Sequence, residues 1–438
     1  MDNKFQLHDL ISNVALIYVE FPNTDKESDL AELYRLIQSA HGKVCYFAEQ
    51  KRNSADPSTV IGSGKLDEIN KGLNILSENI DTVIFSCPLN ATQRAEIQKN
   101  IDIEVTIADR LDLILDIFAL RATTAEGKKQ VELAQLSYNL ATRPQNVKLS
   151  RAGAGIGTRG PGETKLETNK RAIRAKIHRL NKELEDIAQR RQLTRKQRLQ
   201  NQTFTIALVG YTNAGKSTLF NRLTSSDIYA DDLLFATLDT TTRRCKLPSG
   251  TEVLVCDTVG FINNLPHQLV NAFKSTLEEA AYADLILNVV DISDANCETQ
   301  MAVTQSILAE IGANAPQISV YNKCDLSEKL HYACGNDSST VFVSAKNGTN
   351  IDALIDSIEK FAKEQRSSFN VKIPYDEYGK VISLLNKCKG TFELYESDST
   401  NGCESYVLGR MSVNKSCADK FLKYVDFVSD VLKDGREC

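Results

Sequence analysis

The chain has 438 residues, of which 42% are hydrophobic and 25% charged, and its formal net charge is −5. This length and composition exclude a disordered or fibrous protein and allow roughly two to four globular domains. No apolar run approaches the ~18 residues of a membrane span, and MDNKFQLHDL lacks the features of a signal peptide. We therefore expect a soluble cytoplasmic protein with no membrane span. The 11 cysteines are irregularly spaced and are expected to be reduced and mostly buried.

Residues 1–125 alternate between strand-like and helix-like patterns. The runs ALIYVEF, KVCYFAE, TVIFSC and EVTIAD are typical of strands, and segments such as ESDLAELYRLIQSA and ATQRAEIQKNI are amphipathic. Such alternation predicts an α/β domain with a parallel sheet. Gly62 to Lys65 precede a helical pattern, as a phosphate cradle would. Short Gly-Ser turns before helices are common, and a turn is the favoured interpretation.

Residues 126–201 show helical periodicity. Apolar residues recur at helical spacings from Glu126 to Ala141, and a heptad seam follows at Leu166, Ile173, Ile177, Leu180, Leu184 and Ile187. A helix from about Thr164 to Gln200 would be roughly 55 Å long at ~1.5 Å per residue. That length does not fit inside a small domain. We therefore predict a projecting antiparallel helical hairpin.

The predicted hairpin is basic, and its connector is rich in glycine. The connector reads TRPQNVKLSRAGAGIGTRGPGET, and from Arg143 to Gln200 there are 16 Lys/Arg against 5 Asp/Glu. A concentrated basic element in an acidic protein predicts a polyanionic partner, although a solvated charged helix explains the same pattern. Arg151 and Arg159 are the candidate RNA contacts, because a guanidinium binds phosphate oxygens bidentately.

Residues 202–365 form a second α/β unit that contains a P-loop. The pattern of a buried strand is followed by a loop and then by the pattern of a helix. The loop and the first residues of the helix are Gly210, Tyr211, Thr212, Asn213, Ala214, Gly215, Lys216, Ser217 and Thr218. In a P-loop the backbone N–H groups cradle the phosphates and the lysine reaches the β- and γ-phosphate oxygens. The next hydroxyl binds Mg²⁺. These roles fall to Lys216 and Ser217.

Two later segments are expected to sense the γ-phosphate. TEVLVCDTVG places Asp257 at the end of a strand, where it can hold Mg²⁺ through water, and gives Gly260 a backbone N–H for the γ-phosphate. In LLFATLDTTTRR, Thr237 has the best spacing to close over Mg²⁺, and Thr241 is the alternative. Lys216, Thr237 and Gly260 are thus the predicted catalytic residues.

The segments ISVYNKCD and VFVSAK specify the base. A carboxylate at Asp325 can accept hydrogen bonds from N1–H and N2–H₂ of guanine, and adenine offers neither donor. Lys323 is expected along the purine face, and the backbone near guanine O6 is expected to come from Ser344, Ala345 and Lys346. Together with Asn322, these residues predict GTP rather than ATP as the ligand.

Phe261 stands where many GTPases carry a glutamine that orients the attacking water. A phenyl ring cannot hold water by hydrogen bonding. Catalysis must then come from electrostatic stabilisation by Lys216, Mg²⁺ and backbone donors, with help from outside. The sequence predicts a GTPase, converting GTP and water to GDP and phosphate, that is slow on its own.

Residues 366–438 show a β-α-β-β-α pattern. FNVKI, TFELYES and SYVLGRM are typical of strands, and DEYGKVISLLNKC and CADKFLKYVDFVSDVL of helices. The whole chain is thus expected to be a multidomain α/β protein. Its parts are an N-terminal α/β domain with a projecting helical hairpin, a P-loop GTPase domain and a small C-terminal α+β domain.

The motifs GYTNAGKS, FATLDTTTR, DTVGFI, NKCD and SAK, with FALRATTAEGKKQVELAQL and GIGTRGPGETKLET upstream, resemble the HflX family of translation-factor-related GTPases. The resemblance spans about residues 1 to 365, and RGPGET is its most specific part. It implies binding to the large ribosomal subunit through ribosomal RNA, with the hairpin loop reaching toward the peptidyl transferase centre. It also implies splitting of stalled ribosomes in stress and an apolar residue at position 261.

The same resemblance implies two further ligands. It implies ATP binding by the N-terminal domain, for which Gly62 to Lys65 are the candidate residues, and cation-dependent relatives of this class hold K⁺ with an asparagine at the position of Asn213. Three functions remain open. They are a GTP-driven ribosome-dissociating factor, a large-subunit binding or assembly factor regulated by GTP, and an ATP-dependent RNA remodeller. We expect the chain to act as a monomer.

Overall fold

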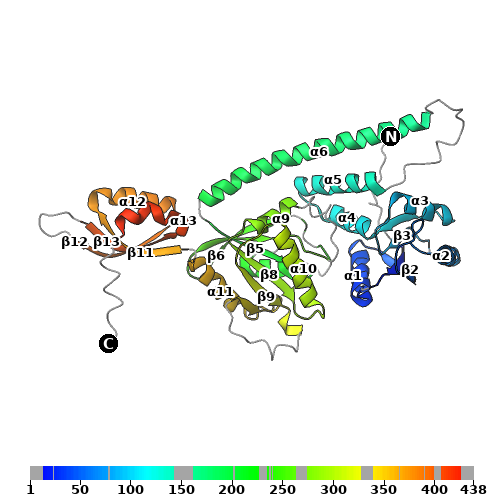
Figure 1. Ribbon diagram of the computed structural model, residues 1–438. Helices are drawn as coiled ribbons and strands as arrows, with labels where there is room; N and C mark the ends of the chain where they lie inside the picture. The colour runs from blue at the N-terminus through cyan, green and yellow to red at the C-terminus, as the bar shows by residue number, and fades with distance from the viewer. Residues whose placement is uncertain are drawn as a thin grey trace.

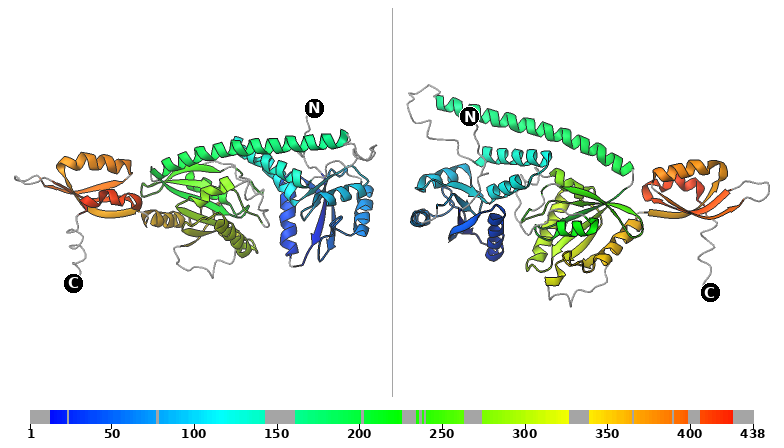
Figure 2. Two further views of the ribbon diagram at one scale, coloured as in Figure 1. Left: turned by 45° about the horizontal axis from the view of Figure 1, so that its top comes forward. Right: turned by 180° about the vertical axis from the view of Figure 1, so that it is seen from behind.

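The computed structural model describes residues 13–22, 24–76, 79–142, 161–200, 203–225, 234–235, 238, 240–262, 274–326, 339–364, 366–388, 390–398 and 406–425. These residues form three units in a row, and one long helix runs beside the first two (Figure 1). Figure 2 shows the same arrangement from two further sides. The predicted α/β multidomain fold is confirmed. No helix in the described ranges is long and apolar enough to cross a membrane.

The first unit is built on four parallel strands in the order β2-β1-β3-β4. The strands are β1 (Asn13–Glu20), β2 (Lys43–Lys51), β3 (Thr82–Phe85) and β4 (Thr106–Asp109). The helices are α1 (Lys26–Ser39), α2 (Ser63–Ile75), α3 (Ala91–Asn100) and α4 (Arg110–Arg121). Every strand predicted in this part of the sequence is present, because each apolar run is long enough to cross the sheet.

Helices cover both faces of this sheet, because alternate residues of a strand point to opposite sides. Leu16 and Tyr18 of β1 pack in one core with α1 and α4, whereas Ile17 and Val19 pack in a second core with α2 and α3. The first of these cores continues into the second unit of the chain. The α1 and α4 face therefore carries the contact between the two units.

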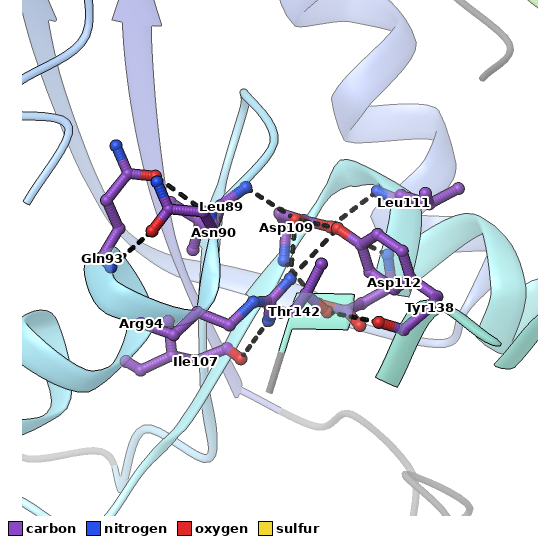
Figure 3. A network of polar contacts seen from close by, with 10 residues as sticks. All are labelled: Leu89, Asn90, Gln93, Arg94, Ile107, Asp109, Leu111, Asp112, Tyr138 and Thr142. Carbon is purple, nitrogen blue, oxygen red and sulfur yellow. Dashed lines mark hydrogen bonds and ion pairs between the residues drawn. The ribbon is translucent and has the colours of Figure 1, made fainter. Parts of the chain in front are cut away.

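A buried polar network fixes α5 (Ala125–Thr142) to the end of β4 (Figure 3). Asp109 accepts hydrogen bonds from Leu89 N–H at 2.9 Å and from Arg94 Nη2 at 2.7 Å. Arg94 also pairs with Asp112 at 2.6 Å, and the Tyr138 hydroxyl on α5 donates to Asp109. Burial and the nearby Asp109 raise the pKa of Tyr138, so this hydroxyl stays protonated as a donor. Removing the Arg94 side chain would leave the buried carboxylates of Asp109 and Asp112 without their charged partner, which is strongly destabilising.

Helix α6 (Pro161–Gln200) pairs with α5 to form the predicted hairpin. Its 40 residues span roughly 60 Å at ~1.5 Å per residue, and it begins three residues before the expected start. Leu180 of the predicted seam is buried, and Ile173, Ile177, Leu184 and Ile187 are half-buried. Ion pairs between Lys129 and Glu183 at 2.9 Å and between Lys176 and Glu132 at 2.5 Å flank the seam. Residues 143–160 of the predicted connector lie outside the described residues, and its two ends belong to α5 and α6.

The second unit contains a six-stranded sheet in the order β10-β9-β8-β5-β7-β6. Its strands are β5 (Phe204–Gly210), β6 (Thr241–Lys246), β7 (Glu252–Asp257), β8 (Leu285–Asp291), β9 (Gln317–Asn322) and β10 (Thr340–Phe342). Its helices are α7 (Lys216–Thr224), α9 (Lys274–Ala281), α10 (Cys297–Glu310) and α11 (Ile351–Glu364). Strand β6 is antiparallel to β7, and the other neighbouring strands are parallel. The carboxyl ends of β5, β7 and β9 therefore meet at one edge.

The third unit is a three-stranded antiparallel sheet in the order β11-β13-β12. Its elements are β11 (Arg366–Pro374), α12 (Tyr375–Lys387), β12 (Thr391–Asp398), β13 (Tyr406–Asn414) and α13 (Lys415–Ala418). The predicted β-α-β-β-α order is confirmed. The last helix was predicted to be longer. A 3₁₀ segment over Asp419–Tyr424 follows α13, and residues 426–438 lie outside the described part of the chain.

Candidate nucleotide-binding site

The P-loop connects the end of β5 to the start of α7, as its sequence predicts. Gly210 has φ +147°, and a Cβ at this position would lie 2.1 Å from the carbonyl oxygen of Val289. Gly215 has φ +89°, and its Cβ would lie 2.2 Å from Asn322 Nδ2. Both positions therefore require glycine. The N–H groups of the first turn of α7 then lie where phosphates bind in P-loop proteins.

Lys216, the P-loop lysine, is buried at the first position of α7. Its Nζ donates a hydrogen bond to the carbonyl oxygen of Tyr211 at 2.8 Å. Burial lowers the pKa of Lys216 to about 8, and the nearby Asp257 opposes this shift. Triphosphate oxygens beside Nζ would favour the charged form in the same way. The lysine is thus held inside the loop, within reach of the predicted phosphate positions.

The two described residues predicted to hold Mg²⁺ lie side by side. The Ser217 hydroxyl donates to Asp257 Oδ2 at 2.8 Å, and Asp257 is fully buried at the end of β7. A hydroxyl and a carboxylate are the hard oxygen ligands that Mg²⁺ prefers next to phosphates. The donor set therefore fits this ion. Thr237 lies outside the described residues, and its alternative, Thr241, opens β6 opposite Asp257.

The predicted guanine-binding residues converge on the P-loop from β9 and β10. Asn322 ends β9, where its Nδ2 donates to the carbonyl oxygen of Ala214 at 2.8 Å and its Oδ1 accepts from Ala345 N–H at 2.9 Å. This one side chain ties the P-loop to the segment of Ser344, Ala345 and Lys346. Asp325 follows in a short 3₁₀ turn, and its side chain is exposed and available to a base.

Two further residues contact the predicted guanine-binding residues and were not predicted from the sequence. Asp291, at the end of β8, pairs with Lys323 Nζ at 2.7 Å. Arg222 on α7 donates to the carbonyl oxygens of Ala345 at 3.2 Å and Lys346 at 2.7 Å. The only sequence pattern that indicated Asp291 was its position as the acidic last residue of the apolar strand LILNVVD. No sequence pattern indicated Arg222, because its hydrogen-bond partners lie more than 120 residues away along the chain.

Phe261 and Gly260 lie directly against the P-loop. Phe261 N–H donates to the carbonyl oxygen of Gly210 at 3.1 Å, and Thr212 N–H donates to that of Phe261 at 2.7 Å. The Phe261 ring is 1% exposed and belongs to the core that the first two units share. Its ring therefore points away from solvent, into the domain contact.

The N-terminal unit contacts both the P-loop and the segment after it. The Tyr211 hydroxyl donates to Glu32 of α1, and Arg110 also pairs with Glu32. Burial raises the pKa of Glu32, and Arg110 and Tyr211 oppose that shift. In the segment that leads to Thr237, Leu234 N–H donates to Ser39 Oγ at 2.9 Å, and Phe235 meets Phe118 edge to face at 4.6 Å between ring centroids. Both segments around the phosphate site are thus attached to α1 and α4.

The candidate ATP residues lie at the start of α2. Gly62 is its N-cap, and its N–H donates to Gln50 Oε1 at 2.9 Å. Lys65 Nζ pairs with Glu68 at 2.7 Å. Both groups thus have protein partners in a helix-initiating turn.

Comparisons with known proteins match GTPase families over most of the chain. Residues 27–119 match the family described as GTP-binding GTPase N-terminal, residues 121–198 the GTP-binding GTPase middle region, and residues 205–323 the 50S ribosome-binding GTPase family. The chain is 43% identical to the GTPase HflX of Caldanaerobacter subterraneus over 84% of its own length and 87% of that protein. It is 37% identical to the GTPase HflX of Escherichia coli over 85% and 88% of the two lengths.

The chain belongs to the HflX family of GTPases. A GTPase HflX of Alkalihalophilus pseudofirmus matches 94% of this chain and 98% of its own length at 40% identity. A solved GTP-binding protein from Sulfolobus solfataricus with bound GDP is 26% identical over 81% of this chain, with a TM-score of 0.42. As an HflX-family member with a complete P-loop and guanine motif, the protein binds GTP and hydrolyses it to GDP and phosphate.

Proposed function

We propose that this GTPase binds the large ribosomal subunit in its GTP form and dissociates stalled 70S ribosomes. Hydrolysis, slow alone and stimulated by the ribosome, then drives its release. The observation that supports this most is the shape and charge of the hairpin. A helix of 40 residues runs beside the two α/β units (Figure 1) and leads back to the basic, glycine-rich connector at its first residues. Such an extension can enter a narrow RNA cavity that excludes a globular surface.

The described part of α6 adds a basic face to that extension. Arg171, Arg174, His178 and Lys182 are exposed at steps of three and four residues, on the side of the helix opposite the buried Leu180. Arg171 also pairs with the exposed Glu167 at 2.9 Å, an interaction that phosphate can replace. A line of basic side chains along one helix face fits an RNA backbone. The polyanion that we propose is therefore ribosomal RNA, bound by a monomer of this chain.

The test of this proposal is the double variant Arg151→Ala/Arg159→Ala. We expect it to lower ribosome affinity by about 100-fold or more, since hydrogen bonds to charged groups contribute ~1.5–3 kcal/mol each and two guanidinium groups are removed. The salt dependence of binding should also become shallower, because fewer counterions are released. Hydrolysis without ribosomes should be nearly unchanged, whereas stimulation by 70S particles should fall sharply. Light scattering and phosphate release at several salt concentrations measure these effects.

A matched control is Lys71→Ala/Lys360→Ala, which removes two exposed positive charges outside the hairpin. This control should keep the affinity, the salt slope and the stimulation of the wild type. If the arginine variant also kept all three, the two arginines would only solvate the connector.

In a second candidate function, the protein binds the large ribosomal subunit but does not split ribosomes. In that case the protein is a binding or assembly factor, and GTP regulates only its residence time. The hairpin favours RNA binding in both cases. A measurement of ribosome dissociation distinguishes the two candidate functions. The proposed role in stress requires that the protein splits ribosomes. An ATP site at Gly62 to Lys65, and with it an ATP-dependent RNA remodeller, stays a prediction.

We propose Mg²⁺ as the resident ion, held by Ser217, through water by Asp257 and, on closure, by Thr237. Beside it we propose K⁺ at Asn213, which lies in the P-loop with φ +61°. Potassium there would offset negative charge that develops in the transition state. Turnover in K⁺ should therefore exceed turnover in Na⁺ at equal ionic strength, and Asn213→Ala should abolish the difference. Equal rates of the wild type in both salts would contradict K⁺ binding.

A further inference from the structure

The HflX-family fold leaves one catalytic task without an assigned residue. The attacking water must be held in line with the bond that breaks. Phe261 cannot do this, because its ring carries no polar atom, lies in the domain core and is fixed by two backbone hydrogen bonds to the P-loop. Another group near the γ-phosphate position, from this chain or from a partner, must hold the water.

Thr212 lies at that position. A Cβ on Gly260 would be 2.8 Å from Thr212 Cγ2, 2.9 Å from Thr212 Cα and 2.9 Å from Lys216 Nζ. In GTPases of this class the lysine binds the β- and γ-phosphates, and the Gly260 N–H binds the γ-phosphate. Thr212 therefore lies against Gly260, close to Lys216, and these are the two groups expected to bind the terminal phosphate.

The hydroxyl of Thr212 differs from its neighbours. Its side chain is 7% exposed, and Oγ1 is buried without a hydrogen-bond partner among the described residues. Three nearby hydroxyls do have partners: Tyr211 donates to Glu32, Ser217 to Asp257, and Thr258 to the carbonyl oxygen of Leu208. A buried hydroxyl normally has a partner. The Thr212 hydroxyl therefore keeps its hydrogen-bonding capacity for a group that enters the site.

We propose that the Thr212 hydroxyl positions the attacking water in place of the missing glutamine. The hydroxyl oxygen accepts a hydrogen bond from the water, and this contact directs a lone pair of the water oxygen toward the γ-phosphorus. As the water oxygen bonds to phosphorus, the bond from phosphorus to the β–γ bridging oxygen breaks, and its electron pair leaves with GDP. The water protons end on the released phosphate and solvent. The hydroxyl itself neither gains nor loses a proton.

The test compares Thr212→Val, which keeps the shape and removes the hydroxyl, with Thr212→Ser, which keeps the hydroxyl and removes the methyl. Single-turnover hydrolysis by the full chain is measured at saturating GTP and Mg²⁺. We expect Thr212→Val to be about 10- to 100-fold slower, since misplacing a reacting group costs up to ~10²-fold. Thr212→Ser should regain most of the rate. Titrations with GDP and a non-hydrolysable GTP analogue should give affinities within about twofold of wild type for both variants.

Three outcomes would overturn this assignment. If Thr212→Val hydrolyses GTP at the wild-type rate, the hydroxyl has no role in the reaction. If valine and serine slow it equally, the methyl packing against Gly260 matters instead. If Thr212→Val loses affinity for the GTP analogue but not for GDP, the hydroxyl binds the γ-phosphate rather than the water. Unchanged GDP affinity shows that each variant is folded.

Discussion

Replacing Asp325 with asparagine is expected to weaken GTP binding by several kcal/mol, or about 10³-fold in affinity. The carboxylate is expected to accept hydrogen bonds from two guanine donors, N1–H and N2–H₂. An asparagine amide turned toward them would place its own donor against one of the two. Xanthine carries an oxygen where guanine carries N2, so the same amide can donate to it. The variant should therefore shift its preference toward xanthosine nucleotides.

The structure shows why this change should stay local. Asp325 is exposed in a 3₁₀ turn that is held from both sides, by Cys324 N–H to the Val343 carbonyl oxygen at 3.2 Å and by Leu326 N–H to that of Lys323 at 3.0 Å. Titration with GTP, GDP and xanthosine diphosphate measures the shift. Asp356→Asn, an exposed change of equal charge on α11, is the control and should bind GTP as the wild type does. Unchanged GTP affinity in Asp325→Asn would remove this residue from the site.

The parts of the site that the sequence predicts are those set by local pattern. An apolar strand followed by Gly210 to Ser217 places the phosphate loop without knowledge of any distant contact, because strand, loop and helix follow directly in the chain. Asp257 and Asn322 are likewise found at strand ends. Parallel strands bring such ends to one edge of the sheet, so these residues meet.

The contact with the N-terminal unit could not be predicted in this way. Tyr211 and Glu32 are separated by 179 residues, and Leu234 and Ser39 by 195. No periodicity links segments so far apart. The sequence showed only that Phe261 cannot hold water, and the structure adds that its ring fills a core shared by two units. Removing a ring this buried generally costs about 3–5 kcal/mol. Position 261 thus has a packing role as well as a catalytic consequence.

The most direct test of the proposed function is ribosome dissociation. Here 70S particles are incubated with the protein and a non-hydrolysable GTP analogue and are then separated on a sucrose gradient. We expect most of the 70S peak to be replaced by 30S and 50S peaks, with the protein in the 50S fractions. With GTP the 70S peak should again be replaced by 30S and 50S peaks, but the protein should be absent from the 50S fractions, because hydrolysis releases it.

Incubation with GDP is the control and should leave the 70S peak intact. The variant Arg151→Ala/Arg159→Ala with the analogue should dissociate far fewer ribosomes, whereas Lys71→Ala/Lys360→Ala should act as the wild type does. The decisive observation is the wild-type gradient with the analogue. Loss of the 70S peak with protein bound to 50S is the predicted result. An undiminished 70S peak, with protein still bound to free large subunits, would contradict ribosome splitting and leave a binding or assembly factor.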